Sequence, residues 1–131
     1  MKKIIKLSKS CIGNEEKQSV MNVLDREYLG MGIEVQKFEN DLSNFFGREV
    51  ICVVNGTAAL HLSLQASNLT LGDEVLLPSL TYIASYQAVS ASGATPIACD
   101  IDPNTMLLDI NDLKKRLTNN TKAIMPVHYS G

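Results

Sequence analysis

Short apolar runs alternate with segments of helical spacing along most of the chain, and this alternation constrains its fold more than any other feature. Strands are predicted at residues 49–54, within 71–79, at 94–102 and at 122–128, and helices at 57–66, 81–92 and 109–118. The alternating order is typical of βαβ units around a mostly parallel sheet with helices on both faces. The sequence therefore predicts an α/β fold, and 131 residues favour one domain.

Two of the predicted strands differ in character. The run "EVICVV" at 49–54 contains three valines and an isoleucine, which suits a strand buried on both faces. The run at 122–128 contains Pro126, which argues against a central position in the sheet.

Two further helices are expected before the first strand. The first spans 14–28 with Asn14 as its cap, and the glycines of "YLGMG" break it. The second is amphipathic and ends at Gly47. The apolar faces are Val20, Val23, Leu24 and Tyr28 on the first helix, and Val35, Phe38, Leu42 and Phe45 on the second.

Composition excludes several classes of function. A net charge of −2 gives no electrostatic attraction to nucleic acid or to an anionic membrane. The start "MKKIIKLSKS" lacks the apolar core of a signal peptide, and no run approaches the length of a membrane span. Cys11, Cys52 and Cys99 are in no metal-binding spacing, so we expect reduced thiols in a cytoplasmic protein without a metal site; Cys52 and Cys99 are read as buried small hydrophobes.

The triplet Asn55-Gly56-Thr57 marks the switch from an apolar run to a helix. The first amides of a helix lack intrahelical partners and carry partial positive charge, so a phosphate could bind there. The alternative is that Asn55 or Thr57 only caps the helix. No Walker-type or complete G-x-G-x-x-G motif is present, so a phosphate would belong to another kind of ligand.

Five blocks follow one another along the chain: "YLGMGIEVQKFENDLSNFFG", "NGTAALHLSL", "GDEVLLPSLTYIAS", "GATPIACDID" and "TKAIMPVHYSG". In this order and spacing they resemble the DegT/DnrJ/EryC1/StrS family of sugar aminotransferases, which use pyridoxal 5'-phosphate (PLP). The resemblance runs from about Asn14 to Gly131. It implies the N-terminal part of the large PLP-binding domain of the aspartate-aminotransferase fold.

The resemblance also implies roles for particular residues. Gly56, Thr57 and Ala58 match the loop that holds the PLP phosphate. Tyr82 matches the aromatic residue that stacks on the pyridine ring, as a flat π face suits a flat ring.

Three residues are candidates for substrate binding. Gly30 and Gly32 match a loop near the sugar-nucleotide entrance, with a flexible turn as the alternative. His128 ends the last predicted strand and is a candidate to line the active-site cleft, with a structural histidine as the alternative. His61 is expected to pack or to lie on the surface.

No catalytic residue is predicted in this chain. Transamination needs a Schiff-base lysine and a carboxylate that pairs with the pyridinium nitrogen. The resemblance places both in blocks that are absent here, and Asp100 and Asp102 are expected to be turn and cap residues. We therefore expect 1–131 to be part of a domain, without the rest of that domain or the small C-terminal domain, and inactive alone.

The activity that the resemblance implies is transfer of an amino group from glutamate to a keto group of a nucleotide-linked deoxysugar. Such sugars enter O-antigens, lipopolysaccharide or related glycans. The alternatives are a PLP-dependent nucleotide-sugar dehydratase and a non-catalytic product of a disrupted gene. The complete protein is expected to form a homodimer in the cytoplasm, with no nucleic-acid or membrane partner.

Overall fold

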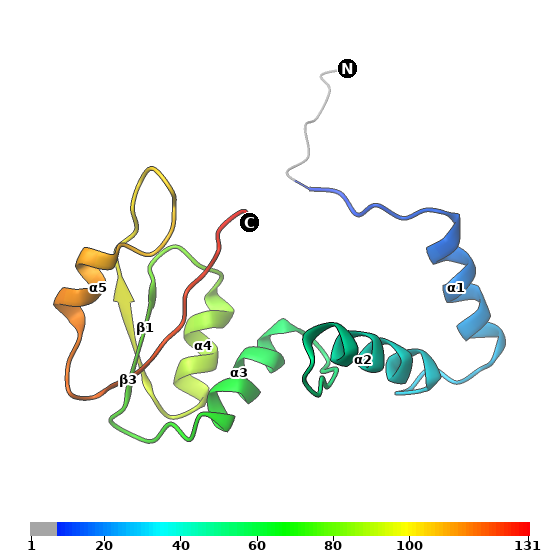
Figure 1. The fold of residues 1–131 in the computed structure, drawn as a ribbon, viewed down its shortest axis with the longest axis horizontal. Coiled ribbons are helices and arrows are strands. Elements are labelled where there is room, and N and C mark those ends of the chain that lie inside the picture. Colours follow the sequence, from blue (N-terminus) through cyan, green and yellow to red (C-terminus); the bar gives the residue numbers. More distant parts are fainter. Residues whose placement is uncertain (1–7) are drawn as a thin grey trace, which may run out of the picture. The chain divides into compact units, whose positions relative to one another are not determined.

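The computed structural model describes residues 8–131, and the chain divides into a first unit that ends at Cys52 and a second unit, Val53–Gly131 (Figure 1). Each unit is described by itself. Most of the start "MKKIIKLSKS", residues 1–7, lies outside the described residues. Within residues 8–131, no helix has both the length and the apolar character that a bilayer crossing requires.

The first unit begins with helix α1, Asn14–Asp25, whose cap differs from the prediction. Gly13 is the N-cap, and Asn14 is already the first residue of the helix. The Glu16 carboxylate accepts the Gly13 N–H at 2.6 Å, and this carboxylate also lies where the helix dipole favours negative charge. The prediction of Asn14 as cap was wrong because Glu16 satisfies the free amide from inside the first turn.

Helix α1 also ends earlier than predicted, at Asp25 instead of residue 28. Glu27 adopts a left-handed φ of 54°, which cannot continue a right-handed helix. Tyr28 therefore lies in the connecting loop and not on a helical face. Helix α2, Ile33–Phe46, follows the loop, and Gly47 with φ 63° ends it as predicted.

The predicted strand at 49–54 is absent from the structure. Side chains of α2 bind the backbone of this segment: Ser43 Oγ accepts the Val50 N–H at 3.0 Å, and Glu39 Oε1 accepts the Cys52 N–H at 2.7 Å. A strand needs a neighbour, and residues 8–131 offer this run none. Ile51, Val53 and Val54 remain exposed, Val54 at 87%. Cys52 is half-buried instead of buried.

The second unit is built on a parallel sheet of three strands. They are β1, Glu74–Pro78, β2, Thr95–Cys99, and β3, Thr121–Ile124, in the order β2-β1-β3. Leu76 of the central strand pairs with Ile97 on one side and Ile124 on the other. This sheet confirms the α/β prediction, and β3 ends at an edge before Pro126.

Helices cover both faces of this sheet. They are α3, Gly56–Ala66, α4, Ile83–Ala91, and α5, Ile110–Arg116. Val75 packs with Leu64 of α3 and Val89 of α4, while Leu76 packs with Leu113 of α5. Successive strand side chains point to opposite faces, so α4 and α5 lie on opposite sides of the strands (Figure 1). Both βα crossovers therefore follow the predicted plan.

Cys99 shares the core under α5 with Leu76 and Leu113. It is a free thiol, 1% exposed, and burial raises its pKa. The expectation of a buried small hydrophobe is confirmed for Cys99.

Leu76→Ala is expected to destabilise the second unit more than any surface truncation. Leu76 is fully buried, so losing its side chain leaves a cavity that costs about 2–5 kcal/mol of unfolding free energy. Leu71→Ala is the matched control, since Leu71 is 94% exposed. Urea denaturation measures both, and equal losses would contradict the assigned core.

Asp112 gives a pH-dependent contribution to stability. It accepts hydrogen bonds from Arg116 Nε and from the Asp100 N–H, and these bonds hold the pKa of its carboxyl below the usual range. A depressed folded pKa stabilises the fold above the unfolded value of about 4, and this stabilisation is lost as pH falls through the folded pKa. Asp112→Asn should therefore lower the unfolding free energy at pH 7 and have a smaller effect at pH 3. An equal loss at both pH values would contradict this origin.

Candidate functional site

The N-terminus of α3 combines a cap with free amides. Asn55 is the N-cap, and its Oδ1 accepts the Ala58 N–H at 2.9 Å. The Ala59 N–H donates to the Asn55 carbonyl at 3.1 Å, as in any helix. Among residues 8–131, the N–H groups of Gly56 and Thr57 have no hydrogen-bond partner. The capping interpretation is therefore correct for Asn55, and two amides still remain free to bind an anion.

Tyr82 lies at the carboxyl end of β1, where the chain turns into α4. It is the N-cap residue of α4, and its side chain is 78% exposed. Gly56, Thr57 and Tyr82 line one hollow of about 600 Å³, together with Leu60 and other residues of α3 and α4. The structure thus brings together three of the four predicted cofactor residues, from segments 25 or more positions apart.

Ala58 lines a different hollow, of about 410 Å³, with Thr57, His61 and Gln87. Its amide is already bound by Asn55. His61 is half-buried, and its Nε2 is buried without a hydrogen-bond partner among the described residues. Because a histidine one turn into a helix is equally compatible with packing and with exposure, the sequence carried no signal for this environment.

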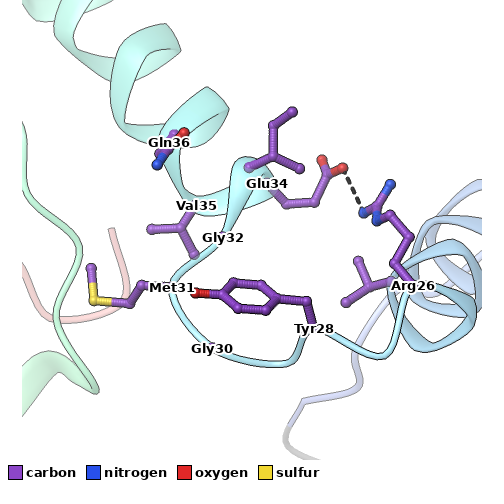
Figure 2. A pocket seen from close by; sticks show the side chains of 10 residues that line it. Arg26, Tyr28, Gly30, Met31, Gly32, Glu34, Val35 and Gln36 are labelled. Carbon is purple, nitrogen blue, oxygen red and sulfur yellow. Dashed lines mark hydrogen bonds and ion pairs between the residues drawn. The ribbon is translucent and has the colours of Figure 1, made fainter.

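Gly30 and Gly32 lie in the loop between α1 and α2, where they line a hollow of about 450 Å³ (Figure 2). The Tyr28 ring packs beneath Gly32: a Cβ at that position would lie 2.8 Å from Tyr28 Cδ1. Arg26 Nη2 binds Glu34 Oε1 at 2.9 Å across the same hollow. Sequence reasoning missed Arg26 and Tyr28, because it assigned both to a helix that ends before them.

His128 is exposed beyond the end of β3. It lines a hollow of about 460 Å³ with Asp102 and Asp109, from the loop after β2. Asp102 Oδ1 accepts the Asn104 N–H at 2.7 Å, and Asp100 Oδ1 accepts the Ile101 N–H at 2.9 Å. The expectation of a turn residue is confirmed for Asp102. It was wrong for Asp100, which lies between β2 and the bridge residue Ile101, and the cap of α5 is Asp109. Residues 8–131 contain no group of three side chains placed to hold a metal ion.

The sequence of residues 10–131 matches the model of the DegT/DnrJ/EryC1/StrS aminotransferase family. The chain belongs to this family. Its enzymes depend on PLP, and the structures similar to this chain include PLP-bound forms. The predicted family is thereby confirmed, and PLP is the cofactor of its enzymes, as predicted.

Two curated relatives cover 98% of this chain. GDP-perosamine synthase of Escherichia coli O157:H7 is 41% identical, and the match spans 36% of that protein. The dTDP-4-dehydro-2,3,6-trideoxy-D-glucose 4-aminotransferase of Saccharopolyspora spinosa is 34% identical, and the match spans 34% of it. The chain thus spans about a third of the length of these family members.

Two solved structures show the same fold. The X-ray structure of the aminotransferase from Psychrobacter cryohalolentis has a TM-score of 0.83 and 33% identity, and the match covers 92% of this chain and 31% of that one. The E. coli GDP-4-keto-6-deoxy-D-mannose-3-dehydratase with bound hydrated PLP has a TM-score of 0.82 and 30% identity, with 92% and 33% covered. The structures similar to this chain therefore include both an aminotransferase and a dehydratase.

The hollow between α3 and α4 fits the chemistry of PLP. Two free amides at a helix N-terminus suit a phosphate, and a Cβ at Gly56 would meet no atom within 4 Å, so the space beside it is open. Tyr82 leaves most of its surface open, as stacking on a flat electron-poor ring requires. A volume of about 600 Å³ is in the range of small-molecule sites.

Gly32→Ala is expected to displace the Tyr28 ring, because the added methyl group would lie 2.8–3.0 Å from two ring carbons. Gly30→Ala is the matched control, since a Cβ there meets no atom within 4 Å. The measurement is ¹⁹F NMR of 3-fluorotyrosine-labelled protein, with the Tyr28 signal assigned by Tyr28→Phe. A shift in the Gly30 variant as large as that in the Gly32 variant would contradict the packing.

Proposed function

We propose that the protein is a PLP-dependent aminotransferase that transfers an amino group from glutamate to a keto group of a nucleotide-linked deoxysugar. The observation that carries this proposal is the shared hollow of Gly56, Thr57 and Tyr82 in a member of this family. The names of both curated relatives, a perosamine synthase and a sugar 4-aminotransferase, support a sugar nucleotide as the acceptor.

In this proposal each residue of the hollow has a defined role. The amides of Gly56 and Thr57 bind the cofactor phosphate, and the Thr57 hydroxyl adds a donor. The Tyr82 ring stacks on the cofactor ring. The Ala58 N–H is bound by Asn55, so Ala58 contributes by stabilising the start of the helix and does not bind the phosphate. Bound PLP supplies an electron sink and carries the amino group.

The loop hollow at Gly30 and Gly32 is the proposed contact for the sugar nucleotide. His128, in the second unit, is proposed separately as a substrate-binding residue. The hollow is lined by the aromatic ring of Tyr28, the guanidinium of Arg26 and the amide of Gln36. These groups suit a heterocyclic base and phosphate oxygens. One relative carries GDP in its name and the other dTDP, so we leave the nucleotide open.

Two essential groups must come from outside this hollow. No lysine within residues 8–131 lines it, and neither does any carboxylate. We propose that the chain is the N-terminal part of the large PLP-binding domain, and that the lysine and the partner of the pyridinium nitrogen come from the remainder. The chain matches only about a third of the length of its curated relatives, which supports this proposal.

We further propose a homodimer in the cytoplasm that supplies amino sugars to lipopolysaccharide, O-antigen or a related glycan. Neither α1 nor α2 has a buried residue, and Phe38 and Phe45 of α2 are 56% and 80% exposed. Such apolar surface favours a protein partner. The perosamine synthase relative supports the glycan role, and three free thiols support a reducing compartment.

A dehydratase is the second candidate, because a dehydratase with bound PLP is among the similar structures. The two activities differ in the fate of the sugar. An aminotransferase gives an aminosugar and consumes glutamate stoichiometrically, whereas a dehydratase removes water. Mass spectrometry of the sugar product distinguishes them.

The test is the reaction of the full-length protein with PLP, glutamate and a panel of GDP- and dTDP-linked 4-keto-6-deoxysugars. We expect a product carrying nitrogen from ¹⁵N-glutamate. Tyr82→Leu should weaken PLP binding about tenfold through the loss of stacking, while Tyr82→Phe should remain within about twofold. Absence of ¹⁵N from every product would overturn the proposal, and loss of water without nitrogen transfer would identify the dehydratase.

A further inference from the structure

Ser85 stands out because it is a polar residue inside an apolar environment. It lies in the first turn of α4 and is only 6% exposed, next to buried Ala84, Ala88 and Val89. It also lines the hollow that contains Tyr82. A buried hydroxyl costs free energy unless it is hydrogen-bonded, so its partner is informative.

That partner is Thr81. The two hydroxyl oxygens are 2.8 Å apart, and either one can be the donor. Thr81 precedes the N-cap of α4, and Ser85 is the third residue of the helix, so the bond brackets Tyr82. The Ser85 N–H also donates to the Tyr82 carbonyl at 3.0 Å. The backbone at Tyr82 is therefore fixed by two hydrogen bonds, one between the hydroxyls of Thr81 and Ser85 and one from the Ser85 N–H to the Tyr82 carbonyl.

The bond between the two hydroxyls lies at a helix start that no side chain caps. Tyr82 is the N-cap residue, and it makes no side-chain capping bond. A second bond reinforces the same turn: the Tyr86 hydroxyl donates to the carbonyl of Pro78, at the end of β1, at 3.2 Å. The segment between β1 and α4 is thus anchored at each end, while the Tyr82 side chain itself remains exposed.

We propose that the hydrogen bond between the Thr81 and Ser85 hydroxyls is a positioning element, which fixes the first turn of α4 and so orients the Tyr82 ring toward a planar ligand in the hollow. The identity of that ligand as PLP rests on the proposed function. Thr81 does not line the hollow, so any effect it has on the ligand passes through Ser85 and Tyr82.

The chain offers a matched pair of variants. Thr81→Val removes the hydroxyl with little change in shape, and Thr81→Ser keeps the hydroxyl. In full-length protein titrated with PLP, we expect Thr81→Val to raise the Kd about three- to tenfold, the effect of one lost hydrogen bond, and Thr81→Ser to remain within about twofold. Ser90→Ala, on an exposed site of the same helix, should match the wild type. Ser85→Ala is the second variant if Thr81→Val does not fold.

A double-mutant cycle separates positioning from a general structural effect. In a Tyr82→Leu background, Thr81→Val should have no further effect on the Kd, because no ring remains to be oriented. An equal loss of affinity in both backgrounds would overturn the inference. The same holds if Thr81→Val binds PLP as tightly as the wild type.

A readout without ligand keeps this inference distinct from the proposed function. The ¹⁹F signal of 3-fluorotyrosine at position 82, assigned by Tyr82→Phe, should shift and broaden in Thr81→Val and not in Thr81→Ser. If the wild type fails to bind PLP, the proposed function is wrong and this signal still tests the positioning bond. An unchanged signal in Thr81→Val would overturn that bond's role.

Discussion

The burial of β1 from both faces is the constraint on which the second unit depends. Val75, Leu76 and Leu77 are each 0% exposed, and consecutive side chains point in opposite directions. One strand therefore fixes two layers at once: α3 and α4 against Val75, and α5 against Leu76. Because parallel strands share a direction, their carboxyl ends meet at one edge of the sheet. Tyr82 follows the end of β1 at this edge, and the burial of β1 thereby determines where the candidate site lies.

Sequence patterns predicted this unit well because its signals are local and agree with one another. A Gly-Asp turn precedes β1, Pro78 ends it, and Gly93 with φ 90° separates α4 from β2. The two failures have different physical causes. The run 49–54 has strand composition, but strand formation requires a partner, and a sequence does not show whether one is available. The end of α1 depended on the backbone conformation of Glu27, a residue type without a preference for left-handed φ.

The candidate site was predictable in its parts but not in its assembly. The helix start at Gly56 and the aromatic residue at 82 were both identified, yet only the fold shows that they line one hollow. The surroundings escaped prediction entirely. The burial of Ser85 and of His61 Nε2, which has no hydrogen-bond partner among residues 8–131, results from packing that no local pattern reports. Sequence identifies groups by type, whereas their environment comes from packing.

The cap of α3 carries a restriction on which residues can replace it. Asparagine and aspartate cap helices equally well, since either side chain offers an oxygen to the Ala58 amide. In the proposed site they are not interchangeable, because an aspartate at position 55 would place a full negative charge beside the two amides meant for a phosphate dianion. The start of α3 therefore has to be capped by a neutral acceptor. Helix stability alone would accept either residue, and only the charge of the ligand discriminates between them.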